Sequence, residues 1–255
     1  MINHFRTESM ASGYAISRPP VHPRVIEQAC KSLGWSQFAQ RALDVGCGAG
    51  LSTKALKGVA KECIGIEPAD AMLKWSAMVA PEAEFAAGTA EAIPICDYSM
   101  DLMTAAGSLN YVNLDLFFPE ARRVLRPLGT LIVYDFLPGR SFRHTSNLDE
   151  WFTRFMQRYP QPANEGRILS PEILGQFDSG FRMQSYQHYE IGIQLTPQFY
   201  LDYMLTETNV AAAIRHGAHL EEIRSWCAET LEPIWNHREQ EILFRGYFAC
   251  MAKIR

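Results

Sequence analysis

Three glycines stand at alternate positions in the stretch RALDVGCGAGLST, directly after a short apolar run. They are Gly46, Gly48 and Gly50, and residues 42–46 have the apolar character of a buried strand. Glycine allows the backbone to bend sharply and lets a ligand approach the main chain without meeting a Cβ atom. The stretch therefore predicts a tight turn after a strand, close to a bound ligand.

Apolar strand patterns and helical patterns alternate along residues 22–136, with short connections between them. This alternation is typical of a parallel sheet covered by helices on both faces, so the predicted fold class is α/β with an open sheet. Strands are predicted at residues 42–46, 62–67, 83–88, 101–108 and 130–136, and helices at residues 22–34, 51–59, 69–80 and 114–129.

The alternation ends after Pro138, and helical patterns then dominate. No linker, repeat or low-complexity segment interrupts the sequence. We therefore expect a single domain over residues 1–255, with a core at about 14–137, a helical cap or insertion at about 140–230 and a closing edge strand at about 240–255. The later predicted elements are helices at residues 147–159, 170–177, 196–214 and 219–235 and strands at 182–193 and 242–254.

Charge and cysteine usage exclude several classes of protein. The net formal charge of −4 gives no general attraction to phosphate backbones, so no nucleic-acid partner is expected. No apolar run approaches the ~20 residues of a membrane span, and the N-terminus lacks an apolar signal core. The six cysteines are scattered, without a short metal-ligand spacing. These features favour a cytoplasmic protein with reduced thiols, no membrane association and no metal.

The glycine spacing discriminates among nucleotide-binding turns. In the dinucleotide fingerprint the third glycine follows the second by three residues, whereas here it follows by two and position 51 is Leu. A P-loop is excluded because no Gly-Lys-Ser/Thr follows. Glu67 ends the second predicted strand, where an acid suits the two hydroxyls of an adenosine ribose. That acid alone does not separate NAD from other adenosine cofactors.

The segments LDVGCGAG and GIEP, taken together, resemble the class I S-adenosylmethionine-dependent methyltransferases. The resemblance continues through GTAEAIPICDYSMDLM and FFPEARRVLRPLGTLIV, so that four motifs follow in the family's order over about residues 14–137. It implies a Rossmann-like, open, seven-stranded and mostly parallel sheet with helices on both faces. Leu128 departs from the family pattern, which often has glycine in this turn.

A narrower resemblance rests on YAISRPPVHP and SLNYVNLDLFFPEARRVL. These segments are most similar to the branch that contains trans-aconitate and ubiquinone-pathway methyltransferases. The trans-aconitate-like enzymes often carry His-Trp where this chain has Asn110-Tyr111. The resemblance therefore does not extend to their substrate.

The family resemblance implies S-adenosyl-L-methionine as cofactor and S-adenosyl-L-homocysteine as product. It implies that Glu67 binds the ribose. It also implies that Asp44 either binds the amino end of the methionine part or braces the glycine loop. It places the segment 88–103 at the adenine ring, with Thr89, Ala90 and Glu91 lining the pocket, although Glu91 is alternatively an ordinary solvated charge. Met72 would lie beside the adenine or simply in the core. The cofactor-binding residues that the resemblance implies are Tyr14, Arg18, Asp44, Gly46, Cys47, Gly48, Gly50, Glu67, Pro68, Met72, Thr89, Ala90, Glu91, Ala106 and Gly107.

Methyl transfer from a sulfonium is an in-line displacement, so the protein mainly aligns the reactants and excludes water. A hydroxyl or phenol acceptor would profit from a general base, for which His144 and then His188 are the candidates. A carboxylate acceptor would instead pair with an arginine. Each histidine could instead have a structural role at the surface or in the core. The aromatic residues of the cap could likewise serve core packing instead of substrate binding. The candidate substrate-binding residues are Asn110, Tyr111, Arg140, Arg143, Tyr186, Tyr200 and Tyr203.

The favoured function is S-adenosylmethionine-dependent methylation of a small molecule, at oxygen, with the cap supplying the acceptor pocket. Methylation at nitrogen or carbon, or of a macromolecule, stays open. So does a non-catalytic protein that binds S-adenosylmethionine as a sensor or scaffold, and so does a homodimer. The glycine spacing disfavours an NAD-linked oxidoreductase.

Overall fold

The computed structural model describes residues 8–162, 166–167, 169–176, 180–236 and 238–254, and these form two compact units. The first, called the sheet unit here, comprises His22–Phe136, Gly166–Tyr189 and Gly246–Arg255. The second, called the helical unit, comprises Met1–Val21, Leu137–Glu165 and Glu190–Arg245. The stretch expected to form a cap is thus shared between both units. The predictions made for residues 1–7 and for Phe177 lie outside the described residues.

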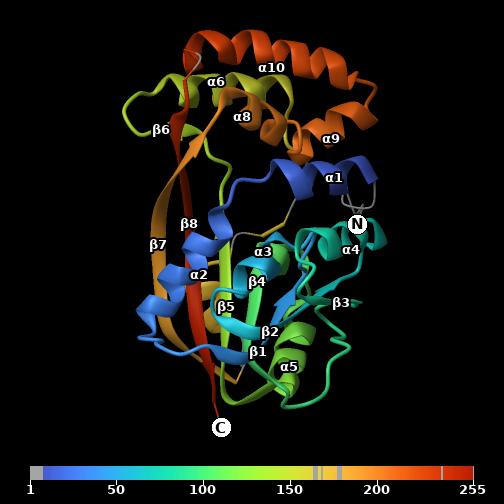
Figure 1. Cartoon of the computed structure of the whole chain (residues 1–255), viewed down its shortest axis with the longest axis vertical. Helices are drawn as coiled ribbons and strands as arrows, with labels where there is room; N and C mark the ends of the chain where they lie inside the picture. The colour runs from blue at the N-terminus through green and yellow to red at the C-terminus, as the bar shows by residue number, and fades with distance from the viewer. Residues whose placement is uncertain (1–7, 163–165, 168, 177–179, 237, 255) are drawn as a thin grey trace. The chain divides into compact units, whose positions relative to one another are not determined.

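Five parallel strands form the centre of the sheet unit, in the order β3-β2-β1-β4-β5 (Figure 1). The chain moves outward from β1 to β3 and then returns to the other side of β1, so the strand order reverses between β1 and β4. In open α/β sheets ligands bind at this reversal, beyond the carboxyl ends of the strands. The strands are β1 Ala39–Val45, β2 Ala60–Glu67, β3 Glu84–Ala87, β4 Met100–Ala106 and β5 Leu125–Phe136.

Three further strands extend the sheet beyond β5. The long strand β8 (Gln240–Lys253) runs antiparallel to β5, with Asp135 opposite Tyr247, and both β7 (Phe181–Leu195) and β6 (Ser141–Phe142) pair with β8. The predicted Rossmann-like, mostly parallel sheet is confirmed, and within the described ranges it has eight strands instead of seven. The additional strand β6 has only two residues, which are too few to show a periodic pattern.

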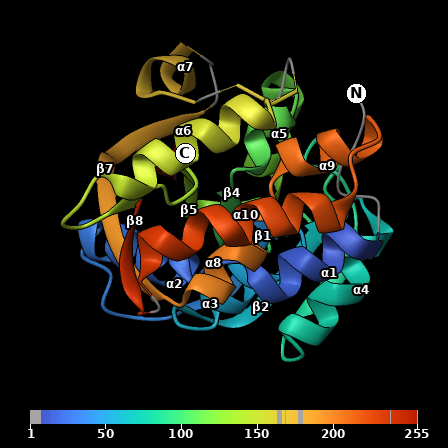
Figure 2. The same cartoon turned by 90° about the horizontal axis from the view of Figure 1, so that it is seen from above.

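Helices cover both faces of the parallel strands. Helix α2 places His22 Nδ1 at 2.9 Å from the Tyr134 hydroxyl, whereas α5 shares a hydrophobic core with Val133. Because successive strand residues point to opposite faces, α2 and α5 lie on opposite sides of the sheet (Figure 2). The helices are α2 Val21–Ser32, α3 Leu51–Leu56, α4 Asp70–Val79, α5 Leu114–Val124 and α7 Pro171–Gln176, with a 3₁₀ turn η2 Ser108–Tyr111.

The helical unit has an aromatic core. Trp151 stacks on Phe155 with ring centroids 5.2 Å apart, and Tyr200 lies 4.8 Å from Trp235. All four side chains are fully buried. In the part of the chain that the structure describes, no helix is both long and apolar enough to cross a bilayer. The unit's helices are α1 Glu8–Ser17, α6 Asn147–Arg158, α8 Pro197–Met204, α9 Thr208–Arg215 and α10 Leu220–Trp235.

Candidate functional site

The glycine turn follows β1 directly, and its three glycines all have positive φ angles: 69° at Gly46, 52° at Gly48 and 89° at Gly50. A Cβ atom on Gly46 would collide with Ser108, and one on Gly50 would lie 2.9 Å from Ser76 Cα. A Cβ atom on Gly48 would have no atom of the described residues within 4 Å. The outer glycines are therefore required by close packing, and Gly48 leaves open space where a ligand can approach the backbone.

Asp44 lies at the end of β1 and is fully buried. Its Oδ2 accepts hydrogen bonds from Ser52 Oγ at 2.6 Å and Thr53 Oγ1 at 2.7 Å, and its Oδ1 accepts one from Thr104 Oγ1 at 2.9 Å. Burial raises the pKa of Asp44, although these three bonds act in the opposite direction. The carboxylate thus ties the first turn of α3 to β4, which is the bracing role expected as one of its two alternatives.

Glu67 ends β2, and its side chain is only 8% exposed. Its Oε2 accepts a hydrogen bond from the Gly48 amide at 3.1 Å, and its Oε1 accepts one from the Ala69 amide at 3.0 Å. Burial raises the pKa of this carboxyl group, and the two amide bonds partly offset the rise. The carboxylate therefore positions the glycine turn from the neighbouring strand.

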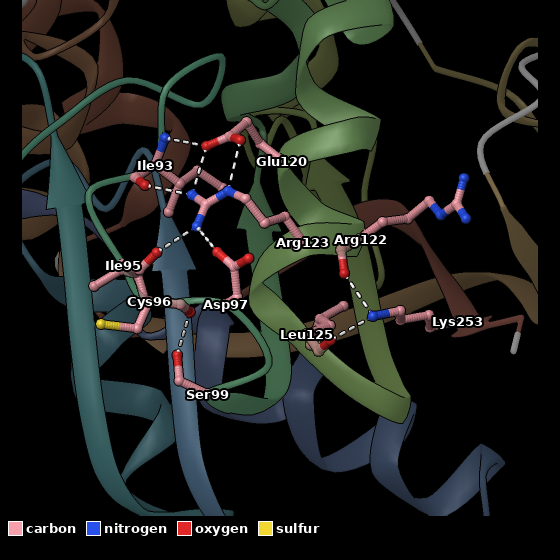
Figure 3. Close-up of polar contacts among 10 residues, drawn as sticks. All are labelled: Ile93, Ile95, Cys96, Asp97, Ser99, Glu120, Arg122, Arg123, Leu125 and Lys253. Atoms are coloured by element: carbon pink, nitrogen blue, oxygen red, sulfur yellow. Dashed lines mark hydrogen bonds and ion pairs between the residues drawn. The ribbon is translucent and has the colours of Figure 1, made fainter.

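The connection between β3 and β4 is held by Arg123 of α5 (Figure 3). Its guanidinium group donates to both Glu120 oxygens at 2.8 and 2.7 Å, to Asp97 at 2.7 Å, and to the carbonyl oxygens of Ile93 and Ile95 at 2.7 Å each. Such a bidentate carboxylate pair fixes both distance and orientation. One arginine thus shapes residues 93–97, which lie within the segment 88–103 that the resemblance assigns to the adenine ring.

The predicted adenine-pocket residues follow β3. Gly88 packs on Pro94, Thr89 forms a short bridge with Ala92, and Ala90 is buried. Glu91 Oε1 accepts a hydrogen bond from the Asn113 amide at 3.0 Å, so this side chain connects two loops.

A third acidic residue at the same edge of the sheet was not predicted from the sequence. Asp135, at the end of β5, accepts a hydrogen bond from Asn110 Nδ2 at 2.7 Å and another from the Phe136 amide at 2.8 Å. Gly107, which follows Ala106 at the end of β4, packs so closely that a Cβ atom there would lie 3.0 Å from Asp135 Oδ1. Burial raises the pKa of Asp135.

The remaining predicted residues of the sheet unit take varied positions. Cys47 and Met72 are buried, and burial raises the pKa of the Cys47 thiol. Pro68 and Tyr111 are exposed. His188 is exposed and lies edge-on to Tyr186, with ring centroids 5.4 Å apart.

Tyr14 and Arg18 belong to the helical unit. The Arg18 guanidinium lies 3.7 Å from the centre of the Tyr14 ring, forms a 3.0 Å ion pair with Glu207 and donates to the Thr206 carbonyl at 3.1 Å. These partners, which are all in the helical unit, hold the side chain between α1 and the connection from α8 to α9. The structure thus gives Arg18 a packing and pairing role within this unit.

Five candidate catalytic or substrate residues also belong to the helical unit. Tyr200 and Tyr203 are fully buried, and the Tyr200 hydroxyl donates to the Gly139 carbonyl at 2.7 Å, so core packing is the role that their contacts support. Arg143 pairs with Glu241, and His144 is exposed beside it in a cavity of about 350 Å³. Arg140 is exposed.

Comparison with known proteins agrees with this geometry. Residues 43–133 match the profile of a family described as methyltransferase domain. A proposed methyltransferase of Dictyostelium discoideum is 34% identical over 95 residues, which are 37% of this chain and 36% of that protein. A demethylmenaquinone methyltransferase of Thermotoga maritima is 29% identical over 118 residues, which are 45% of this chain and 52% of that protein. The chain thus matches about half or less of the length of these curated relatives.

Solved structures extend the likeness to most of the chain. A proposed type II methyltransferase from Anaeromyxobacter dehalogenans superposes with a TM-score of 0.65 at 22% identity, covering 84% of this chain and 89% of the other. At this identity the likeness establishes the fold. Residues 43–133 therefore match a methyltransferase domain, and the sheet that contains them has the fold and strand order of a solved methyltransferase-like structure, with the glycine turn directly after β1.

Proposed function

We propose that this protein transfers a methyl group from S-adenosylmethionine to a small molecule, at an oxygen atom. One observation carries the proposal: the open backbone at Gly48 lies beside the buried carboxylate of Glu67, where the strand order reverses. An adenosyl ligand needs both features at this place: open space for its methionine part and a hydrogen-bond acceptor for its ribose hydroxyls.

The residues present fit the cofactor. Each Glu67 oxygen accepts one hydrogen bond from the described backbone, and a carboxylate oxygen has room for two, so each can also accept a ribose hydroxyl. Asp44 adds a second negative charge behind the turn, which favours the cofactor's ammonium and sulfonium groups. When bound, the cofactor would supply an electrophilic methyl group.

The chain's own residues would then align the methyl acceptor with the methyl group. The bonds of Asp44 to Thr53 and Thr104 keep the turn, α3 and β4 in one arrangement. Arg123 keeps residues 93–97 folded within the segment expected at the adenine ring. Because methyl transfer is an in-line displacement, such fixed positioning contributes directly to the rate.

A small-molecule acceptor and a cytoplasmic location are part of the proposal. The acidic net charge of −4 disfavours nucleic acid, and the Thermotoga maritima relative is named for demethylmenaquinone. The described cysteines are free thiols and all but Cys96 are buried, as suits a reducing compartment.

Isothermal calorimetry with S-adenosylmethionine, S-adenosylhomocysteine and NAD tests the cofactor. We expect both adenosyl ligands to bind and NAD not to bind. Transfer of labelled methyl groups to a panel of phenols and alcohols then tests turnover. NAD binding, or no adenosyl binding, would refute the proposal, and adenosyl binding without any transfer would favour a sensor or scaffold.

A further inference from the structure

A polar cluster lies at the carboxyl end of β5, outside the residues assigned to the cofactor. It consists of Asn110, Asp135 and Tyr247, which all belong to the sheet unit. Asp135 and Tyr247 are directly paired across β5 and β8, so their side chains lie on the same face of the sheet. Asn110 joins them through its 2.7 Å bond to Asp135.

Two polar atoms of this cluster are buried without a hydrogen-bond partner among the described residues. One is Asn110 Oδ1, which faces away from Asp135 because the amide nitrogen must be the atom that donates to the carboxylate. The other is the hydroxyl of Tyr247, whose side chain is only 7% exposed. Leaving a buried polar atom without a hydrogen-bond partner is unfavourable, so two such atoms in one place point to a ligand.

The cluster is close to the glycine turn. Ser108 packs against Gly46 and donates to the Val45 carbonyl at 2.6 Å, and the next residue back, Gly107, packs against the Asp135 carboxylate. A short chain of contacts within one unit thus links the turn to Asp135. The aromatic ring of Tyr186 stacks on Tyr247 with centroids 5.3 Å apart and covers the cluster's apolar side.

We propose that Asn110, Asp135 and Tyr247 form the methyl-acceptor subsite, that the acceptor is a neutral hydroxyl or phenol, and that Asp135 takes its proton. This inference rests on the proposed function. The cluster offers two acceptors, the Asp135 carboxylate and Asn110 Oδ1, and one donor, the Tyr247 hydroxyl. A hydroxyl group can donate a hydrogen bond to one of these acceptors and accept one from Tyr247. A carboxylate as methyl acceptor would instead be repelled by the negative charge of Asp135.

The proposed step balances. The acceptor hydroxyl donates to Asp135, and its oxygen accepts from the Tyr247 hydroxyl. That oxygen forms the new bond to the methyl carbon, the electron pair of the broken carbon–sulfur bond stays on the donor's sulfur, and the hydroxyl proton moves to Asp135. Burial raises the pKa of the Tyr247 hydroxyl and Asp135 raises it further, so Tyr247 stays protonated and able to donate.

A chromogenic phenol tests the subsite without any turnover. The protein is first saturated with S-adenosylhomocysteine, whose binding is measured separately by calorimetry. 4-Nitrophenol is then added, and its phenolate absorbance is followed against pH. We expect the bound phenol to titrate about one pH unit higher than the free phenol, because the Asp135 carboxylate hydrogen-bonds the neutral form and repels the phenolate.

Variants of Asp135 and Tyr247 test which residue causes the titration shift and which contributes to phenol binding. Asp135→Asn should abolish the titration shift, and Tyr247→Phe should weaken phenol binding about fivefold while the protein stays folded. Asp115→Asn, the same change at an exposed residue of α5, should alter neither. An unchanged titration in Asp135→Asn, or no phenol binding to the loaded protein, overturns the subsite. Failure to bind S-adenosylhomocysteine would instead overturn the proposed function.

Discussion

The Gly48 amide donates a hydrogen bond of 3.1 Å to Glu67 Oε2, so the turn after β1 is positioned by an acid at the end of β2. Glu67→Ala removes this bond and the expected ribose contacts together. Hydrogen bonds to charged groups contribute about 1.5–3 kcal/mol, so calorimetry should show S-adenosylhomocysteine binding weakened by about 10- to 100-fold. The control is Glu62→Ala, an exposed acid on the same strand, which should bind as the wild type does. Equal affinity in both variants would contradict the role of Glu67.

Asp44 gives a prediction about stability. The change Asp44→Asn leaves one side-chain oxygen to accept from three hydroxyl donors, those of Ser52, Thr53 and Thr104. We expect the free energy of unfolding to fall by about 1–3 kcal/mol in urea denaturation, because buried groups lose partners. Asp97→Asn, an exposed acid in the same unit, is the control and should cost much less. An unchanged urea midpoint in Asp44→Asn would rule out a bracing role.

Arg123 gives a prediction about the loop that it holds (Figure 3). Arg123→Gln removes the bidentate pair with Glu120 and the bonds to the carbonyl oxygens of Ile93 and Ile95. Hydrogen exchange at residues 93–99 should become faster, and S-adenosylhomocysteine should bind about fivefold more weakly, since the loop must be ordered on binding. Arg122→Gln changes the adjacent residue, whose side chain points away from this network (Figure 3), and should leave both measurements unchanged.

The parallel core and the glycine turn could be predicted from the sequence because their signals are local. A buried strand shows as an apolar run, and Gly48 and Glu67 stand directly at strand ends. The acceptor cluster could not be predicted in the same way. Asp135 carries the same signal as Glu67, an acid ending a buried strand, but its pairing with Tyr247 joins two strands far apart in the sequence.

The residue patterns also did not predict where two of the helices end. The helix predicted at residues 114–129 ends at Val124, and β5 begins at once with Leu125. Apolar spacing is compatible with either element in so short a run. Likewise, the single helix predicted at residues 196–214 is divided, because the chain leaves helical geometry at Glu207 before α9 starts.

Leu128 adopts a φ of 66° and is 66% exposed. This left-handed conformation costs a residue with a Cβ atom about 1–2 kcal/mol, and an exposed side chain gains little in return. We expect Leu128→Gly to raise the free energy of unfolding by about 0.5–1 kcal/mol after the larger backbone entropy of glycine is included. Leu128→Ala keeps the Cβ atom and should give no such gain. A stabilisation by alanine equal to that by glycine would show that the strain is not in the backbone.

Asp135 gives a prediction about pH. Burial raises the pKa of Asp135 above its ordinary value, while Asn110 and the Phe136 amide partly oppose the rise. The hydroxyls of Tyr134, Tyr189 and Tyr247 also interact with this carboxyl group. A raised pKa means that the folded protein binds this proton more readily than the unfolded chain does. The contribution of Asp135 to the free energy of unfolding is therefore largest below its unfolded pKa and is lost as the pH rises through its folded pKa.

Asp135→Asn removes this titration. Urea denaturation at several pH values should therefore show the variant gaining stability relative to the wild type as the pH rises from about 4 toward neutrality. Asp115→Asn, at an exposed position, should show no such trend. A constant difference between Asp135→Asn and the wild type at all pH values would mean that Asp135 has the same pKa in both states. A raised pKa makes the Asp135 carboxylate a stronger proton acceptor, which suits the role proposed for it.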